Sequence, residues 1–516
     1  MLRWAIDATA LALILAAAQG CSSTSSSAAP DASTEASTNV DGGTDAPTEA
    51  GPPPPDCGSM PPTGTQVVAS TDPLAVLTLT TDNHAIYENL TTQEVYGVAL
   101  AGGMPSDIGK MTSQVGTIWA HGSGVLYLPI AADPQTSIAP ISSWTAAGGT
   151  SVISTSALAY DSYYYTYDVS ADGQNVAYFA TTDSMTATLT VSTIDGKTQK
   201  PLVTGVDLTD QSCSPMLQFV NDILIVQYCV LPTATEDAGT PAETTTIAVF
   251  TAPTFAPVTL GTTFLQPPGG FVQVDPTGKL ALLLDPAGTG LSLYPLAGGS
   301  SVTVDPTGVS GLFTATGDII YTTSNAALMR YTAATAMTIV LVPSGVVAPV
   351  DLSPDGNWLQ VTSKQDATTE LMSLYIVSAT TPGAANSVVP TATTSPAGFT
   401  TDSQYSVFGT NFPPDFGPVT YDLEASKTSG GAAAKVLSAS GRAFFTSGAK
   451  LVSNTNQSKS TGSADIVSLD LSTTAAPTTL VTQANPNLFQ PSASQIVYSW
   501  YCNENAMAGV WTLTPP

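Results

Sequence analysis

The chain has 516 residues, of which 43% are hydrophobic and 10% are charged, with 12 Lys plus Arg against 39 Asp plus Glu. The net charge of −27 argues against nucleic acids and anionic membrane surfaces as partners, because both repel an acidic protein. The apolar content is ordinary for a globular protein, so the chain is long enough to bury a large core.

The first twenty residues predict an export signal. Arg3 precedes an apolar run, residues 8–18, that is too short to stay in a bilayer as a spanning helix. The sequence Ala-Gln-Gly-Cys that ends at Cys21 resembles the lipobox of bacterial lipoproteins, although Ala18 stands where that family prefers Leu. The resemblance implies that residues 1–20 are removed and that Cys21 carries acyl chains, which anchor the protein in a membrane. An ordinary secretory signal followed by a chance cysteine is the alternative.

Residues 21–56 predict a tether between the lipid and a folded body at residues 57–516. After Cys21 the segment consists almost entirely of Ser, Thr, Ala, Asp, Gly and Pro and holds no aromatic residue, Lys or Arg. Such a composition cannot bury a core, so we expect a disordered spacer. Ser22 directly follows the cysteine, and resemblance to Gram-negative lipoproteins then implies an outer-membrane lipoprotein that faces the periplasm or the cell surface.

The four cysteines of the folded body predict two disulfides, because their number is even and the chain is bound for an oxidising compartment. A hairpin centred on Asn221 would place Cys213 opposite Cys229. The remaining pair, Cys57 with Cys502, would then join the end of the tether to the last strands. Buried free thiols are the alternative.

One short pattern recurs along the folded body: a polar turn of Asp, Gly, Ser or Asn, followed by an apolar run rich in Ile, Val, Leu and Tyr. Its copies begin at Thr80, Ala120, Ser170, Phe219, Asp275, Thr314, Ser353, Thr400, Thr446 and Pro491. Most neighbouring copies start about 40 to 55 residues apart, which is the length of one four-stranded propeller blade. Each copy predicts a hairpin, because Asp-Gly and similar pairs tolerate the positive φ angles that tight turns need.

The repeat therefore predicts an all-β fold, namely a β-propeller of four-stranded blades. About ten copies exceed the usual four to eight blades. We expect one ring of eight or more blades. The alternatives are two propellers in tandem, or one or two copies that are not blades. The last unit ends after about three strands, and the segment QVVAS from Gln66 would supply the missing one. Such pairing of N- and C-terminal strands would close the ring and remove an open sheet edge.

Two copies of the repeat resemble a known family. The segments SPDGNWL from Ser353 and SADGQNVA from Ser170 look like the S-P-D-G-x-x-[IL]-[AV] signature of TolB-like, WD-type propeller repeats. The other copies keep the turn and the apolar run but lose Pro or Asp, so the likeness is firmer for the propeller class than for TolB itself. The resemblance implies a protein partner in the cell envelope.

Motifs for catalysis and cofactor binding are missing from the sequence. His84 and His121 are its two histidines, and neither has Cys, His or Glu at metal-ligand spacing, so no metal site is expected. Neither a G-x-S-x-G elbow nor a phosphate-binding P-loop occurs. The sequence thus predicts no cofactor and favours a role without catalysis.

Aromatic residues supply the candidate binding surface. The segment AYDSYYYTYDVS from Ala159 places tyrosines beside carboxylates, which suits sugars or peptides, and TNFPPDFGPVTY from Thr410 offers two phenylalanines for a funnel mouth. The candidate ligand-binding residues are Tyr160, Tyr163, Tyr165, Tyr167, Phe412 and Phe416. The alternatives are tyrosines that pack within a blade and an ordinary loop between strands.

These features together predict a monomeric lipoprotein of the cell envelope whose propeller is a non-enzymatic binding or scaffolding module for protein or glycan ligands. An envelope polysaccharide lyase or hydrolase built on a propeller platform is the alternative. A surface coat or adhesion protein is a third hypothesis.

Overall fold

The computed structural model describes residues 63–515 apart from 111–117, 130–136, 160–165, 184, 210–214, 221, 231–244, 262–272, 285–289, 347, 363–371, 384–385, 393–394, 411–420, 441–442, 457–463, 493 and 503–506. In these residues the chain forms strands and turns without a helix, which confirms the all-β prediction. Within the same ranges, the chain offers no helix of sufficient length and apolarity to cross a membrane.

Six sheets have four strands each, and their strands pair in chain order. These strands are β2 (Leu74–Leu79), β3 (His84–Asn89), β4 (Glu94–Ala99), β5 (Ser106–Lys110), β14 (Met216–Val220), β15 (Ile223–Cys229), β16 (Thr245–Thr251), β17 (Ala256–Gly261), β18 (Gln273–Val274), β19 (Leu280–Leu284), β20 (Leu291–Pro295), β21 (Val302–Asp305), β22 (Gly308–Phe313), β23 (Ile319–Thr323), β24 (Leu328–Thr332), β25 (Met337–Val342), β26 (Ala348–Leu352), β27 (Trp358–Thr362), β28 (Met372–Ser378), β29 (Asn386–Ala392), β30 (Ser395–Phe399), β31 (Tyr405–Thr410), β32 (Tyr421–Lys427) and β33 (Ala434–Ser440). Their antiparallel pairing is the pattern of propeller blades.

An eight-stranded sheet joins two further units of four strands. Its strands are β6 (Ile118–His121), β7 (Gly124–Tyr127), β8 (Ile138–Thr145), β9 (Gly149–Leu158), β10 (Tyr167–Val169), β11 (Asn175–Ala180), β12 (Thr186–Thr193) and β13 (Gln199–Asp207). One residue pair, Ala157 with Ala180, connects β9 to β11 and so links the two units.

A seven-stranded sheet brings the two ends of the described chain together. Its strands are β1 (Thr65–Ser70), β34 (Ala443–Phe445), β35 (Lys450–Thr455), β36 (Ala464–Asp470), β37 (Thr478–Ser492), β38 (Gln495–Cys502) and β39 (Met507–Leu513). The long strand β37 pairs with β36 through its first part and with β38 through its second part. Strand β1 pairs with β39, so the segment around Gln66 does join the last strands.

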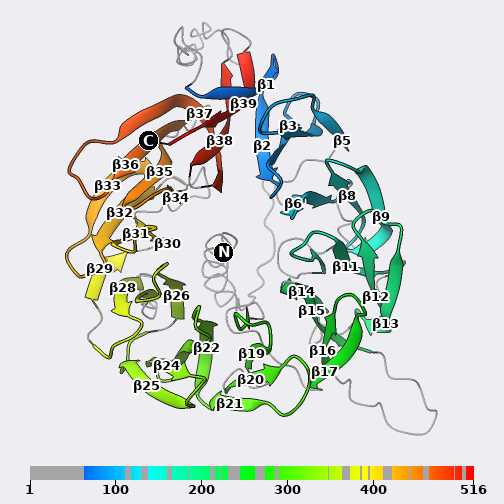
Figure 1. The fold of residues 1–516 in the computed structure, drawn as a ribbon, viewed down its shortest axis with the longest axis vertical. Coiled ribbons are helices and arrows are strands. Elements are labelled where there is room, and N and C mark those ends of the chain that lie inside the picture. Colours follow the sequence, from blue (N-terminus) through cyan, green and yellow to red (C-terminus); the bar gives the residue numbers. More distant parts are fainter. Residues whose placement is uncertain are drawn as a thin grey trace, which may run out of the picture.

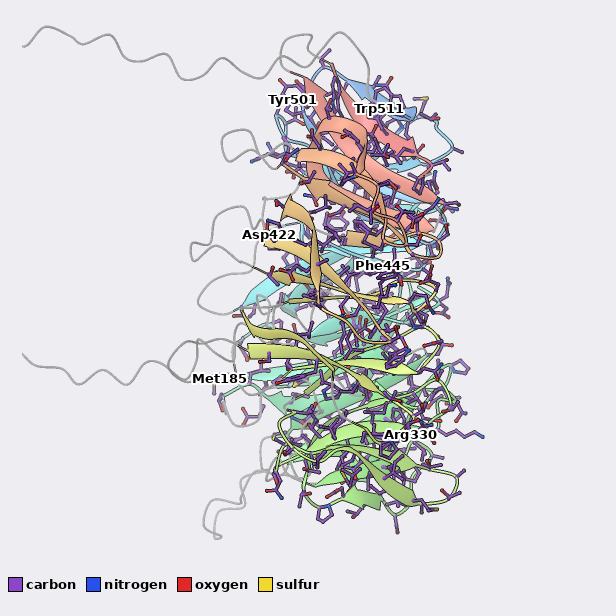
Figure 2. The ribbon with its side chains drawn as sticks, turned by 90° about the vertical axis from the view of Figure 1, so that its left-hand side faces the viewer. Met185, Arg330, Asp422, Phe445, Tyr501 and Trp511 are labelled. Atoms are coloured by element: carbon purple, nitrogen blue, oxygen red, sulfur yellow. The ribbon has the colours of Figure 1, made fainter. Side chains whose placement is uncertain are left out.

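The sheets lie radially around a central axis and follow one another in chain order (Figure 1). Seen from the side, Met185 and Asp422 lie toward one face of the ring, and Arg330 lies toward the other (Figure 2). This arrangement is a β-propeller, and each four-stranded unit is called a blade below.

The recurring turn is built by side chains that bond to its own backbone. Ser353 is buried, its hydroxyl donates to Asp355 Oδ1 at 2.6 Å, and Trp358 N donates to Ser353 Oγ at 2.9 Å. The Asp355 carboxylate in turn accepts the Asn357 amide at 3.0 Å. Gly356 has a φ of +71°, which glycine adopts without strain. This geometry explains why Ser, Asp and Gly recur at these spacings.

Neighbouring blades pack through their faces and touch through their turns. Val76 on β2 belongs to the same buried cluster as Val510 on β39, so the β2–β5 sheet packs against the sheet that contains β39. The Asp355 amide donates to Ser403 Oγ in the turn of the next blade at 3.1 Å. Gly97 lies against Trp144 of the next blade, and a Cβ on Gly97 would come within 2.4 Å of the indole ring. Close packing here requires a glycine.

Candidate functional site

The candidate site is a cleft of about 600 Å³ between β9 and the β10–β13 blade. One wall is the stretch Val152–Ser156 of β9. The opposite wall comes from Tyr178 on β11, Thr188 and Thr190 on β12, and Gln199 on β13. A cavity of this volume is of the size that takes a small ligand or a short peptide.

A bulge in β9 explains how the two walls are joined. Ser154 pairs with Ile141 and Val152 pairs with Ser142 on β8, so Ile153 between them has no partner in that ladder. The Ile153 carbonyl instead accepts hydrogen bonds from Gln199 Nε2 at 2.9 Å and from the Tyr178 hydroxyl at 3.4 Å. Side chains of the β10–β13 blade therefore satisfy a backbone carbonyl of β9 in the preceding blade.

Further hydrogen bonds join the two walls near Ser156. The Thr181 amide donates to the Ser156 carbonyl at 3.3 Å, and the Ser156 hydroxyl donates back to the Thr181 carbonyl. The Ser154 hydroxyl donates to the Ser156 carbonyl at 2.9 Å. Among the described residues, the Thr188 hydroxyl forms no hydrogen bond, so it is available to a ligand.

The cleft is electrically neutral. Its described lining contains no Asp, Glu, Lys, Arg or His. Burial raises the pKa of Tyr178, so that hydroxyl stays protonated and acts as a neutral donor. Asp183 lies outside the lining, and hydrogen bonds from the Thr186 and Met185 amides hold its pKa below the usual range. The described lining can therefore bind through hydrogen bonds, and it holds no carboxylate, histidine or lysine for proton transfer.

The predicted aromatic residues fall mostly outside the described part of the chain. Tyr160, Tyr163, Tyr165, Phe412 and Phe416 are not among the described residues, so their role in binding stays a prediction. Tyr167 lies in β10 and packs in a buried cluster with Tyr178 and Ile153. Its burial favours the alternative for this residue, in which the ring fills the blade.

The predicted cysteine chemistry is largely beyond the described residues. Cys229 at the end of β15 is buried and disulfide-bonded, and its partner is not described. Cys21, Cys57 and Cys213 lie outside the described ranges, as does the side chain of Cys502. The two pairings and the lipidated Cys21 therefore stay predictions, although the hairpin expected around Asn221 is present because Val220 pairs with Ile223.

His84 is paired with Asp82 and does not act on the nearby hydroxyl of Thr80. Its Nδ1 lies 3.1 Å from Asp82 Oδ1, and the Thr80 hydroxyl donates to the same oxygen at 2.5 Å. The carboxylate thus lies between the hydroxyl and the imidazole, which prevents His84 from taking a proton from Thr80. The ring of His121 is outside the described side chains. In the described part of the chain, no group of three or more His, Cys, Asp or Glu could hold a metal ion.

Comparison with known proteins relates the chain to others through its fold. No family model and no curated protein matches it. Among similar solved structures, a prolyl endopeptidase is 13% identical with a TM-score of 0.38, over 69% of this chain and 54% of its own. Porphyromonas gingivalis dipeptidyl peptidase 4 is 11% identical with a TM-score of 0.39, over 86% of this chain and 66% of its own.

A eukaryotic initiation factor is 11% identical with a TM-score of 0.42, over 73% of this chain and 90% of its own. The chain spans about half the length of the prolyl endopeptidase that it matches. Likeness at these identities concerns the fold alone.

These comparisons correct one prediction. The expectation of a non-enzymatic binding or scaffolding module for protein or glycan ligands is wrong. The finding against it is that solved structures of similar fold, namely the prolyl endopeptidase, dipeptidyl peptidase 4 and the tricorn protease, are peptidases. What the likeness itself shows is the fold.

Proposed function

We propose that this propeller has a peptidase-like role, in which the cleft between β9 and the β10–β13 blade receives peptide for hydrolysis. The observation that carries the proposal is the neutral lining of hydroxyl and amide groups beside the outer strand of a blade. A peptide presents one backbone donor and one acceptor per residue, and an extended peptide can lie along a strand edge.

The dimensions of the cleft support a short peptide as ligand. The β9 wall runs over Val152–Ser156, which at about 3.3 Å per residue matches a similar length of extended peptide. Val152 is 59% exposed at this wall and offers an apolar contact for a side chain. Thr188 offers a hydroxyl from the opposite wall, and Gln199 offers its amide oxygen, since its Nε2 already donates to Ile153.

The role of the cleft is to hold and orient the peptide. Its described lining has no nucleophile paired with a base, so bond cleavage falls to groups other than this lining. Orientation alone is a large contribution to catalysis, because it replaces a search in solution with a fixed geometry.

The test uses the full chain and a set of neutral fluorogenic peptides, with binding measured first and hydrolysis second. T188V removes one hydroxyl at constant shape, and T259V does the same on β17 of another blade as the matched control. The loss of one hydrogen bond predicts roughly fivefold weaker peptide binding for T188V and none for T259V. Absence of peptide binding, or equal binding by the two variants, contradicts the proposal.

We further infer that the propeller is one ring of ten blades. Its support is the six separate four-stranded sheets, the two units in the eight-stranded sheet, and the two in the seven-stranded sheet that share β37. The tenth blade then consists of the second part of β37 with β38, β39 and β1. Its closure combines N- and C-terminal strands, which removes a free edge.

We also propose that the protein is an outer-membrane lipoprotein held by acyl chains on Cys21, and that its repeats are TolB-like. The lipobox-like residues before Cys21 support the anchor. The shared turn geometry supports the kinship, since Ser170 donates to Asp172 at 2.5 Å just as Ser353 donates to Asp355. C21A should release the protein from membranes, and continued membrane association of this variant contradicts the anchor.

A further inference from the structure

A buried glutamine at the contact between two blades lacks one hydrogen-bond partner. Gln360 on β27 is fully buried, and its Nε2 donates to Gly398 O at 3.2 Å, Ser406 Oγ at 2.6 Å and Val407 O at 3.1 Å. All three acceptors belong to the β30–β33 blade. Its Oε1 is buried and has no partner. The three acceptors fix the orientation of the amide, because the flipped amide would face the two carbonyls with an oxygen.

A carboxyl group lies directly opposite this glutamine. Asp351 on β26 is the register partner of Gln360, and such partners project to the same face of an antiparallel pair. Asp351 Oδ2 also lies 3.1 Å from the position that a Cβ on Gly398 would occupy. Gly398 has no Cβ, which leaves this space open for the carboxyl, and its φ of +114° is one that glycine adopts without strain. Both side chains therefore approach the same residue of β30.

No cation balances Asp351 among the described strands that pack on β26. β27, β30 and β22 contain no titratable residue, and Tyr321 on β23 donates its hydroxyl to Asp305 at 2.9 Å. Asp318, which precedes β23, is paired with Arg330 at 2.6 Å. Burial of Asp351 raises its pKa to about 6.

We propose that protonated Asp351 donates a hydrogen bond to Gln360 Oε1 and thereby forms a pH-sensitive clasp between the β26–β29 and β30–β33 blades. The proton supplies the one donor that the buried oxygen lacks. It also holds the amide so that Nε2 stays aimed at the next blade. When the proton leaves, two acceptors face one another, and the contact between the blades weakens.

The raised pKa of Asp351 decides how the stability of the folded protein changes with pH. The folded protein binds a proton at Asp351 over a range in which the unfolded chain has released it. This contribution to stability is present at low pH and is lost as the pH rises toward and through about 6. Neutral surroundings therefore loosen the clasp, and mildly acidic surroundings tighten it. The clasp is independent of the proposed cleft.

The test is thermal unfolding of the full chain at about pH 5 and about pH 7.5, on either side of the Asp351 titration. D351N carries a permanent donor in place of the proton, so the fall in unfolding temperature between the two pH values should be smaller than in the wild type. D355N is the matched control. Burial alone would raise the pKa of Asp355, but hydrogen bonds from Ser353 and Asn357 outweigh burial and hold that pKa below its usual range. Asp355 therefore does not titrate between the two pH values, and D355N should keep the wild-type fall in unfolding temperature. A fall in D351N equal to that of the wild type overturns the proposal.

Infrared difference spectra of the wild type keep the proposal testable should D351N fail to fold. A protonated carboxyl that is present at about pH 5 and ionises near pH 6 supports the clasp. Carboxyl groups that titrate only at the ordinary aspartate value, near pH 4, refute it.

Discussion

Substitution of Gly97 by Ala tests how tightly adjacent blades pack. The new Cβ would lie 2.4 Å from Trp144 Cη2 and 2.5 Å from Cζ2, closer than any ordinary contact. Trp144 is 1% exposed, so its ring has little room to retreat. Overpacking of this kind costs about 1–3 kcal/mol, against a gain of at most about 1 kcal/mol from the lower chain entropy of alanine. We expect G97A to lower the free energy of unfolding by about 1–2 kcal/mol.

Denaturant unfolding of G97A, W144F and the double variant measures this packing. The smaller phenylalanine ring leaves space for the new methyl group, so the double variant should be less destabilised than the sum of the single variants by about 1 kcal/mol. Strictly additive effects, or a G97A protein within about 0.5 kcal/mol of the wild type, would refute the proposed clash.

Three further predictions concern single contacts. R330M removes a guanidinium whose Nη2 lies 2.6 Å from Asp318 Oδ2. It should lower the free energy of unfolding in denaturant by about 2–3 kcal/mol, because it leaves a nearly buried carboxylate unpaired. The double variant of D318N and R330M should recover part of this loss. S353A removes the hydroxyl that organises its turn and should cost about 1 kcal/mol, and an unchanged unfolding midpoint would contradict that role. Burial alone would raise the pKa of Asp275, but hydrogen bonds from Thr277 and the amides after it outweigh burial and hold that pKa below the usual range. The contribution of Asp275 is present above about pH 4 and lost at lower pH, so D275N should reduce the loss of stability on acidification, as measured by unfolding at several pH values.

The repeating hairpins could be predicted from the sequence because their causes are local. Ser353, Asp355 and Gly356 define a turn through bonds within a few residues, and the apolar run that follows marks a strand. The pairing of the segment around Gln66 with the last strands could be predicted because the last repeat lacked a strand. The recurring turn and apolar run are therefore enough to predict most of the strands and their pairing into hairpins.

The cleft and the buried pair could not be predicted, because both depend on contacts between blades. The cleft exists because Ile153 leaves the ladder of its own blade and bonds to Gln199 of the next. Nothing near Asp351 in the sequence distinguishes it from the many turn aspartates. Its pairing with Gln360 is visible only once β26 and β27 are aligned. For Tyr167 the sequence left two possibilities, ligand binding and packing within a blade, and only the placement of β10 in the core favours the second.

The long strand β37 makes the end of the chain one cooperative unit. Its first part belongs to the ladder with β36 and its second part to the ladder with β38, so neither ladder can open without strain on the other. Strand β39 extends the same sheet to β1. Amide hydrogens from β36 to β39 and those of β1 should therefore exchange with solvent as a single group, slower than amides in sheets that end freely.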